Sequence, residues 1–531
     1  MKVKYYMVMA MMLGIVPAMA QETYENANIA TGDLNGTARY VGMGGAMEAL
    51  GADISTMSTN PAGIGLFRHS TASMSFGFIS QNDAQDFANG NKTNLSFDQV
   101  GFVYSNRLGR NSFVNFGFNY HKSRNFNHIL KAAGRLDGAS QNRMSYNKGV
   151  AAAENGWDFV FPNGTEDEIV SNDLAYSQTD YLYYNTILYN PLIDPSGESK
   201  YYNYGSERYM MDRASTGYIG EYDFNISGNI NDRVYLGLTV GLHDVHYRSY
   251  SEYAELFLPN QEGLGGALLE DTREITGFGF DIKAGVIFRP IEESPFRIGL
   301  SVATPIWYDL TTSNYTTLLI DDTNANPDTY RGLGALDLWE SYDFKLYTPW
   351  KFGMSLGHTV GNFLALGASY EYADYGSLDS RVNNGYDYMW ERETSEADEW
   401  MNDHTKNTLK GVSTLKLGAE FKPDPSIAVR LGFNYVSPMY EQDGVKDGTL
   451  NSYGVMYQSA TDRTNWKDTY RVTAGLGYRI DKLSLDLAYQ YSQTNGTFTP
   501  FTDVLDATNV AESVDVSNKR NQLLFTIGYT F

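Results

Sequence analysis

The sequence predicts an all-β fold: a 14-stranded antiparallel transmembrane β-barrel that follows a short N-terminal segment. Three observations lead to this prediction. Fourteen segments alternate apolar residues with polar residues or glycine, the connections between them are alternately short and long, and the chain ends on an aromatic residue, Phe531. Period-two alternation places apolar side chains on one face of a strand. Short turns at one end and long loops at the other are typical of outer-membrane barrels.

The alternating segments run from residue 72 to the C-terminus. In the first of them Ala72, Met74, Phe76 and Phe78 share one face, and small or polar residues occupy the other. An even number of strands is what a bacterial outer-membrane barrel requires. The predicted strands are 72–78, 100–104, 114–120, 222–226, 234–242, 278–288, 296–302, 350–356, 364–372, 415–421, 427–435, 470–478, 483–491 and 523–531.

The connections separate a barrel from a soluble sandwich, whose strands would alternate in the same way. Short and long connections alternate strictly, so we expect both chain ends on the side of the short turns, the periplasmic side. The longest connection, 123–216, contains the Tyr-rich stretches 181–184 and 201–204. The predicted short turns are 106–111, 229–232, 290–294, 360–362, 423–425 and 481; the long connections are roughly 81–96, 125–215, 250–273, 309–340, 377–407, 439–468 and 495–517.

The composition excludes several classes of protein. The 531 residues are 14% aromatic, with 41 Tyr and 51 Gly. After the N-terminus no window approaches the roughly 18–20 apolar residues of a membrane-spanning helix. There is no cysteine, so no disulfide can stabilise the exported chain. The net charge of −23 argues against binding to nucleic acid, because phosphate contacts need Lys and Arg. We interpret the acidic runs as solvated loops.

The first twenty residues have the features of a secretory signal peptide. Lys2 and Lys4 precede an apolar run over residues 5–16, and residues 18–20 read Ala-Met-Ala, an A-x-A cleavage site. The apolar run is shorter than a helix needs to span a membrane. The predicted organisation is a signal peptide over 1–20, an N-terminal segment over 21–69 and a barrel over 70–531.

Four basic residues on three consecutive predicted strands point into the lumen: Lys416, Arg430, Arg471 and Arg479. A cluster of these cations could hold an anionic head group such as a carboxylate. The alternative is that they pair with inward-facing acidic residues in a polar lumen.

Catalytic and metal-binding patterns are absent. His243 and His246 are three residues apart on a strand, so they point to opposite faces and cannot share a metal ion. His121 and His128 are separated by the end of the third strand. No zinc-protease, nucleophile-elbow or phosphate-loop motif occurs. We therefore expect no catalytic activity, no cofactor and no metal site.

Residues 37–67, TARYVGMGGAMEALGADISTMSTNPAGIGLF, combine a glycine-rich run, a segment of small residues and Asn60-Pro61-Ala62 before the first strand. This stretch resembles the N-terminal hatch of the FadL family, whose members transport long-chain fatty acids and other hydrophobic compounds across the outer membrane. The strand number agrees with that family, and the chain is similar to a Bacteroidetes-like member of it.

The resemblance implies a hatch over residues 21–69 that plugs the barrel, with Arg39, Gly42, Gly44, Gly45, Asn60, Pro61 and Ala62 as its gate residues. It also implies passive uptake of a hydrophobic ligand that is captured by the extracellular loops, passes the hatch and leaves sideways near strand three. The candidate residues for that lateral opening are Phe113, Asn115, Gly117 and Asn119.

The expected location is the outer membrane of a Gram-negative bacterium. The expected partners are a fatty-acid-like small molecule, outer-membrane lipid and lipopolysaccharide, and the barrel-assembly machinery through Phe531, with the chain as a monomer. Three alternatives stay open. They are a cargo-binding barrel of type IX secretion, a haemin receptor and an outer-membrane enzyme.

Overall fold

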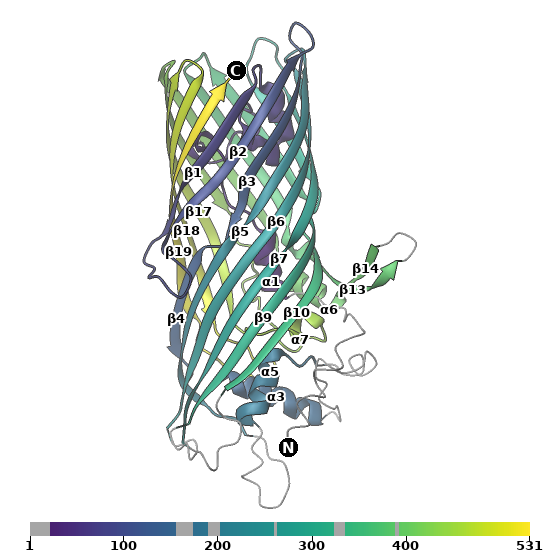
Figure 1. The fold of residues 1–531 in the computed structure, drawn as a ribbon, viewed down its shortest axis with the longest axis vertical. Helices are drawn as coiled ribbons and strands as arrows, with labels where there is room; N and C mark the ends of the chain where they lie inside the picture. Colours follow the sequence, from purple (N-terminus) through teal and green to yellow (C-terminus); the bar gives the residue numbers. More distant parts are fainter. Residues whose placement is uncertain (1–21, 155–173, 189–201, 260–262, 323–334, 388–391) are drawn as a thin grey trace, which may run out of the picture.

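The computed structural model describes residues 22–154, 174–188, 202–259, 263–322, 335–387 and 392–531, so the predicted signal peptide lies outside the described residues. The chain forms one closed antiparallel sheet (Figure 1). Its strands are β1 (Thr71–Gln81), β2 (Thr93–Arg107), β3 (Phe113–Asn125), β4 (His128–Arg135), β5 (Ser206–Ile230), β6 (Val234–Phe257), β7 (Leu264–Phe288), β8 (Arg297–Ala303), β9 (Trp307–Asp322), β10 (Ala335–Tyr347), β11 (Lys351–Val360), β12 (Leu364–Asp374), β13 (Asp379–Asp387), β14 (Arg392–Ala397), β15 (Gly411–Asp424), β16 (Ile427–Val436), β17 (Arg463–Ile480), β18 (Leu483–Thr499) and β19 (Val514–Thr530).

The sheet is a 14-stranded barrel, as predicted. Five of the barrel strands are each interrupted once, so β3 and β4, β8 and β9, β10 and β11, β12 and β13, and β14 and β15 are successive pieces of one barrel strand. The barrel closes between its first and last strands, which pair from Thr71 opposite Thr530 to Gln81 opposite Arg520. All six predicted short turns are confirmed, because each joins two paired strands at the end of the barrel where the C-terminus lies (Figure 1).

At the end of the barrel away from the short turns, the strands are longer than the sequence predicted. The predicted long connection 250–273 is mostly strand, since β6 continues to Phe257 and β7 begins at Leu264. The outward residues of β6 explain the difference. They change from Leu238 and Val240 to polar residues such as Asp244 and His246. The apolar alternation therefore ends while the backbone ladder goes on, from Val234 opposite Phe288 to Leu256 opposite Gly266.

A belt of exposed apolar side chains surrounds the half of the barrel near the short turns. Leu95 is 72% exposed and Phe278 is 70% exposed, values that a soluble protein surface would rarely show over every strand. Such a belt is the lipid-facing surface of a transmembrane barrel. Its members include Met74, Phe76, Phe78, Phe97, Phe102, Phe116, Phe224, Leu236, Leu238, Phe280, Leu300, Phe352, Leu366, Leu417, Leu431, Val472, Leu487 and Leu523.

Residues 22–70, which we call the N-terminal segment, lie inside the barrel (Figure 1). They form two helices, α1 (Thr23–Ala30) and α2 (Ala38–Gly42), and two short 3₁₀ helices, η1 (Ile54–Ser58) and η2 (Pro61–Leu66). Side chains cap all four: Glu22, Thr37, Asp53 and Asn60 each accept a hydrogen bond from a backbone N–H in the turn that follows. Pro61 takes the first position of η2, where its missing N–H costs nothing.

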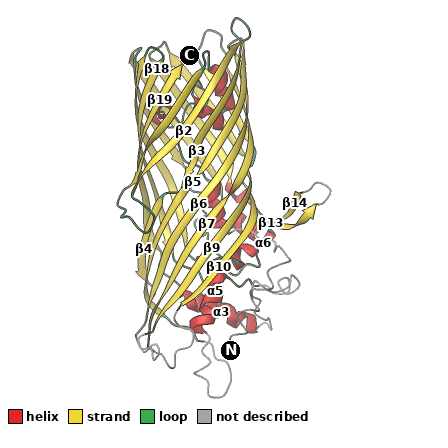
Figure 2. Cartoon of the chain, viewed as in Figure 1, coloured by secondary structure: helices red, strands yellow, loops and turns green. Residues whose placement is uncertain are grey.

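Further helices gather at the end of the barrel away from the C-terminus (Figure 2). Among the described residues no helix is long and apolar enough to cross a membrane. The helices are α3 (Gln141–Glu154), α5 (Gln178–Tyr183), a π-helical turn η3 (Tyr184–Leu188), η4 (Tyr375–Ser377), α6 (Glu399–Thr408) and α7 (Tyr453–Met456).

Candidate functional site

The N-terminal segment is packed against the wall through glycines that face the lumen. A Cβ at Gly237 would overlap the backbone of Pro61 and Ala62, and a Cβ at Gly432 would overlap that of Met43 and Gly44. Only glycine allows two backbones to approach so closely. We call this set the glycine belt: Gly101, Gly117, Gly237, Gly285, Gly299, Gly357, Gly367, Gly418, Gly432 and Gly475.

The predicted gate residues lie on opposite parts of this contact. α2 and the turn that follows it, with Gly42, Gly44 and Gly45, lie against β15 to β18. Gly44 has a φ of +64°, and a side chain there would overlap the backbone of Phe433. Asn60, Pro61 and Ala62 lie instead against β5, β6 and β7. These residues therefore do not form one site. They belong to two separate stretches of the contact between the N-terminal segment and the barrel wall.

Arg39 is the charged member of the predicted gate, and it anchors the segment to the wall. Its Nε and Nη2 donate to the two carboxylate oxygens of Glu420, at 3.0 and 3.1 Å, and its Nη1 donates to the backbone oxygen of Ala52 at 2.9 Å. A bidentate arginine–carboxylate pair fixes orientation as well as position. Glu420 belongs to β15, so the pair ties the N-terminal segment to a barrel strand.

Lys416, Arg430, Arg471 and Arg479 do not form the common head-group cluster that the sequence suggested. Lys416 donates to Glu48 of the N-terminal segment at 2.8 Å, and Arg430 donates to Glu420 and Asp486 at 2.7 and 2.6 Å. Arg479 is exposed at the turn between β17 and β18, where it donates to the backbone oxygen of Asp481. The physical reason is that buried cations are stable only when paired, and carboxylates of the wall and the N-terminal segment supply the partners.

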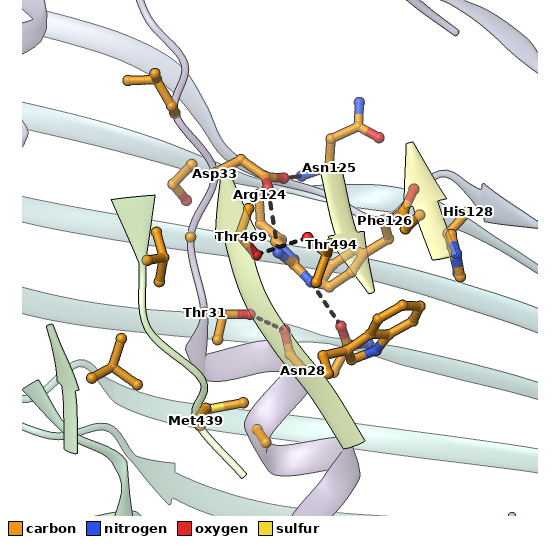
Figure 3. Close-up of a pocket in the computed structure, with 18 of the residues that line it drawn as sticks. Asn28, Thr31, Asp33, Arg124, Asn125, Phe126, His128, Met439, Thr469 and Thr494 are labelled. Carbon is orange, nitrogen blue, oxygen red and sulfur yellow. Dashed lines mark hydrogen bonds and ion pairs between the residues drawn. The ribbon is translucent and has the colours of Figure 1, made fainter. Parts of the chain in front are cut away.

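Arg471 has a different environment, which the sequence analysis missed. It lies near Asp33 of the N-terminal segment together with Arg124 of β3 and Arg520 of β19, at 4.0, 3.4 and 3.9 Å between nitrogen and carboxylate oxygen. Asp33 also accepts from the backbone N–H of Asn125 (Figure 3). Three guanidinium groups thus share one carboxylate. We call Arg124, Arg471 and Arg520 the arginine trio.

The arginine trio lines a cavity of about 500 Å³ in the lumen, a volume within the range of small-molecule sites. The same cavity has an apolar wall, and Figure 3 shows Phe126 and Met439 among its lining residues. A lumen site that offers both an apolar wall and excess positive charge suits a molecule with an apolar body and an anionic head. The apolar wall consists of Tyr24, Phe126, Leu130, Tyr247, Ile306, Val412, Val436, Met439, Tyr440 and Trp466.

Strand three is closed at the residues predicted for a lateral opening. β3 pairs with β2 from Phe113 opposite Arg107 to His121 opposite Gln99, and it pairs with β5 over the same residues. The side chain of Asn115 donates to backbone oxygens of the N-terminal segment, and Gly117 contacts Met57. The prediction of an opening at Phe113, Asn115, Gly117 and Asn119 is therefore wrong for this structure, because continuous ladders join these residues to β2 on one side and to β5 on the other.

The irregularity of this barrel strand lies further along. The β3–β5 register shifts between Lys122 and Arg124, and after it β4 pairs with β5 from His128 opposite Ser215 to Arg135 opposite Arg208. In the described chain no ladder joins the other edge of β4 to β2 or β19. The side chain of Gln81 spans this seam: it donates to the oxygen of Ile129 at 2.7 Å and accepts from its N–H at 2.8 Å.

A second cluster of buried side chains contains residues that are far apart in the sequence. His121 of β3 lies beside Glu221 and Asp223 of β5, and its nitrogens are 3.6 and 3.8 Å from their carboxylate oxygens. His243 of β6 is 3.9 Å from Glu221. His243 and His246 do point to opposite faces, since His243 is buried and His246 is exposed. The expectation of no metal site considered only histidines that are close in sequence, whereas strand pairing brings His121 to Glu221 and Asp223, whose ligand atoms lie close enough for one ion.

Within the long connection 123–216, α3 and α5 form a helical cover at the mouth opposite the C-terminus (Figure 2). Lys148 of α3 and Asp180 of α5 form a fully buried pair at 2.5 Å, and burial raises the pKa of Tyr183 well above its usual value. Arg143 of α3 pairs with Asp506 at 2.6 Å. Hydrogen bonds from Thr508, assisted by Arg143, lower the pKa of Asp506 to about 2. Of the Tyr-rich stretches, Tyr201 lies outside the described residues.

No protein-family model and no curated protein sequence matches the chain. Solved structures are similar in fold. The toluene transporter TbuX of Ralstonia pickettii is 13% identical with a TM-score of 0.48, and the alignment covers 94% of this chain and 99% of that one. For the P. putida toluene transporter TodX the identity is 11%, the TM-score 0.47 and the coverage 94% and 99%.

A FadL homologue from Pseudomonas aeruginosa is 15% identical with a TM-score of 0.45, and the alignment covers 97% of this chain and 99% of that one. At these identities the likeness concerns the fold. These three solved structures are two toluene transporters and a FadL homologue, and FadL is the family that residues 37–67 resemble.

Proposed function

We propose that the chain is an outer-membrane transporter for the passive uptake of hydrophobic small molecules that carry an anionic head group, such as long-chain fatty acids. The observation that carries the proposal is the lumen cavity of about 500 Å³, which combines an apolar wall with the arginine trio. The apolar belt supports a position in a lipid bilayer, and in this proposal the cavity lies on the route across the membrane.

The arginine trio supplies the head-group selectivity in this proposal. Asp33 neutralises one of three guanidinium groups, which leaves two positive charges beside the apolar wall. A ligand carboxylate would gain charge-assisted hydrogen bonds there, and its chain would leave water for the apolar wall. The extracellular loops and the helical cover are the proposed capture surface, and the N-terminal segment is the proposed plug below the cavity.

The ligand leaves sideways in this proposal, at the seam between Gln81 and β4. The cavity reaches the seam, because Ile79 of β1 and Leu130 of β4 are among its lining residues. The seam also lies at the edge of the apolar belt, three residues beyond Phe78. An apolar solute gains free energy by entering lipid rather than water, which favours a lateral exit over an axial one.

The test is the retention and binding of a fatty acid by gently purified protein. We expect mass spectrometry of the extracted lipids to show a fatty acid, and a fluorescent fatty acid to bind. Arg124→Gln with Arg520→Gln should weaken binding of the carboxylate by about a hundredfold or more, the loss expected for two charge-assisted hydrogen bonds. The matching fatty alcohol should bind both proteins alike, and Arg479→Gln, an exposed arginine outside the cavity, is the control.

Retention of no lipid, together with equal binding of acid and alcohol by the wild type, would contradict the proposal. Co-purification of an exported protein in stoichiometric amount, with unchanged fatty-acid uptake after deletion of the gene, would instead favour the cargo-binding alternative.

A further inference from the structure

Six charged or ionisable side chains from β3, β5, β6 and β7 meet in the lumen: His121, Glu221, Asp223, His243, Asp281 and Lys283, which we call the carboxylate–histidine cluster. Each of them is at most 6% exposed. The register explains the meeting, because His121, Glu221 and His243 lie directly opposite one another on three neighbouring strands. Gly241 leaves the space at the centre, since a Cβ there would contact Lys283 and overlap Asp281.

Lys283 occupies one side of the carboxylates. Its Nζ donates to Glu221 Oε1 at 2.7 Å, to Asp223 Oδ1 at 3.2 Å and to Asp281 Oδ1 at 2.9 Å. All three donor sites of the ammonium are therefore used. The second oxygens of Glu221 and Asp223 remain for another partner.

Those second oxygens face the histidines. Glu221 Oε2 is 3.6 Å from His121 Nε2 and 3.9 Å from His243 Nδ1, and Asp223 Oδ2 is 3.8 Å from His121 Nδ1. These separations are too long for hydrogen bonds, and Asp223 Oδ2 and His243 Nδ1 have no hydrogen-bond partner in the structure. Two fully buried polar atoms thus point into a gap between carboxylates and imidazoles, where an unpartnered atom is costly.

The charge of the cluster is also unbalanced. Three carboxylates surround a single ammonium, so with neutral histidines two negative charges are buried without a cation. A second, divalent cation between the histidines and the free oxygens would balance them. Imidazole nitrogen combined with carboxylate oxygen is a donor set for zinc and similar transition metals, whereas Ca²⁺ and Mg²⁺ prefer oxygen alone.

His243 has the arrangement of a metal-binding histidine. Its Nε2 hydrogen-bonds Asp281 at 3.2 Å, which leaves the lone pair of Nδ1 directed at Glu221. Metal-ligating histidines commonly donate their other ring nitrogen to a carboxylate in this way, which sets the tautomer and the ring orientation.

We propose that the carboxylate–histidine cluster binds one divalent cation of the zinc class, with His121, Glu221 and Asp223 as ligands and His243 as the adjoining fourth ligand. Lys283 neutralises the outer carboxylate oxygens and does not bind the ion. The ion would join β3 to β5 and β6 beside the cavity, on the wall where Gly117 contacts the N-terminal segment. This proposal does not depend on which ligand the barrel transports.

The experiment titrates the full chain, refolded in detergent and stripped of metal, with Zn²⁺ by calorimetry and with Co²⁺ by visible absorption. We expect one equivalent of Zn²⁺ per chain and Co²⁺ absorption bands of low coordination number. His121→Gln and Asp223→Asn should each remove this binding. Asp281→Asn should weaken it by about 10–100-fold, as loss of an orienting carboxylate does.

His128→Gln is the matched control, because His128 is a buried histidine of the same cavity whose Nε2 has no hydrogen-bond partner among the described residues. It should bind Zn²⁺ like the wild type, and heat-modifiable migration in gels shows which variants are folded barrels. A folded wild type that binds no Zn²⁺ would overturn the proposal, since protons then balance the cluster. So would equal binding by His121→Gln and Asp223→Asn, or binding of Ca²⁺ and Mg²⁺ as tight as that of Zn²⁺.

Discussion

Gly237 shows what a single residue contributes to the contact between the N-terminal segment and the wall. It faces Pro61 and Ala62, the inert stretch that has no nucleophile, charge or metal ligand. Asn60 caps the turn with its own side chain, and Pro61 fixes its φ. This stretch therefore contributes through its shape: it is a stiff, uncharged turn whose backbone packs against glycines of the wall.

Gly237→Ala should push η2 away from the wall, because the added methyl overlaps the Pro61 backbone. Overpacking of this kind costs about 1–3 kcal/mol. We expect higher conductance of small ions in planar bilayers, with the barrel still folded by heat-modifiable migration. Gly109→Ala is the control, since its Cβ would have no neighbour closer than 3.6 Å. An unchanged conductance in Gly237→Ala would count against a sealing contact.

Among the elements, β4 pairs with a neighbouring strand on one edge only in the described chain. Its pairing with β5 is complete, but the side chain of Gln81 replaces a backbone ladder on the other side. An opening at this seam breaks two side-chain hydrogen bonds, whereas an opening at Phe113–His121 would break a continuous ladder with β2. The seam is thus the weaker part of the wall.

A cross-link across the seam tests the lateral exit. The chain has no cysteine, so Gln81→Cys with Ile129→Cys can be joined selectively by a short bismaleimide. We expect the cross-linked barrel to bind fatty acid, but we expect cells that carry it to take up no fatty acid through it. The control is Phe76→Cys with Phe525→Cys, opposite residues of the closed β1–β19 ladder, whose cross-link should leave uptake unchanged. Full uptake by the cross-linked seam would exclude this exit.

For the whole molecule, the N-terminal segment and the barrel form a single packed unit. The segment meets the wall through the glycine belt, through Arg39 with Glu420 and through Glu48 with Lys416. The cavity lies between this segment and the loops at the far mouth, where α1 packs against α6. A filled lumen of this kind explains why a wide barrel need not leak water-soluble compounds.

Removal of residues 22–60 from the exported chain should convert the barrel into an open pore. We expect a large rise in the conductance of polar solutes, because the barrel wall pairs without help from the segment. The measurement is single-channel conductance, and the same deletion should weaken fatty-acid binding because the apolar lining residues Tyr24, Ala27 and Leu34 are lost from the cavity. A folded barrel with the conductance of the full chain would show that the segment is no plug.

Local pattern was enough to predict the barrel strands and their short turns. Alternation marks lipid-facing residues, so all fourteen strands were found where they cross the apolar belt, as with Leu236 to Leu242 in β6. The same signal could not predict the outer halves of β5, β6 and β7, whose faces mix apolar and polar residues, as Val245, Ser249 and Tyr253 do on the inner face of β6. The sequence also indicated which charged residues face inward, but it did not show their partners. Arg430 was therefore predicted to bind a ligand, whereas it pairs with Glu420 and Asp486.

The sequence by itself determined the all-β class, the number of strands, the side of the short turns and the inert character of the turn at Asn60-Pro61-Ala62, because these follow from residue type and spacing along one strand. Only the tertiary structure decided which side chains meet across strands. His121 joins Glu221 and Asp223, and Arg124 joins Arg471 and Arg520, through strand register and barrel closure. Register and closure depend on hydrogen bonds between residues far apart in the chain, and no local pattern encodes those pairs.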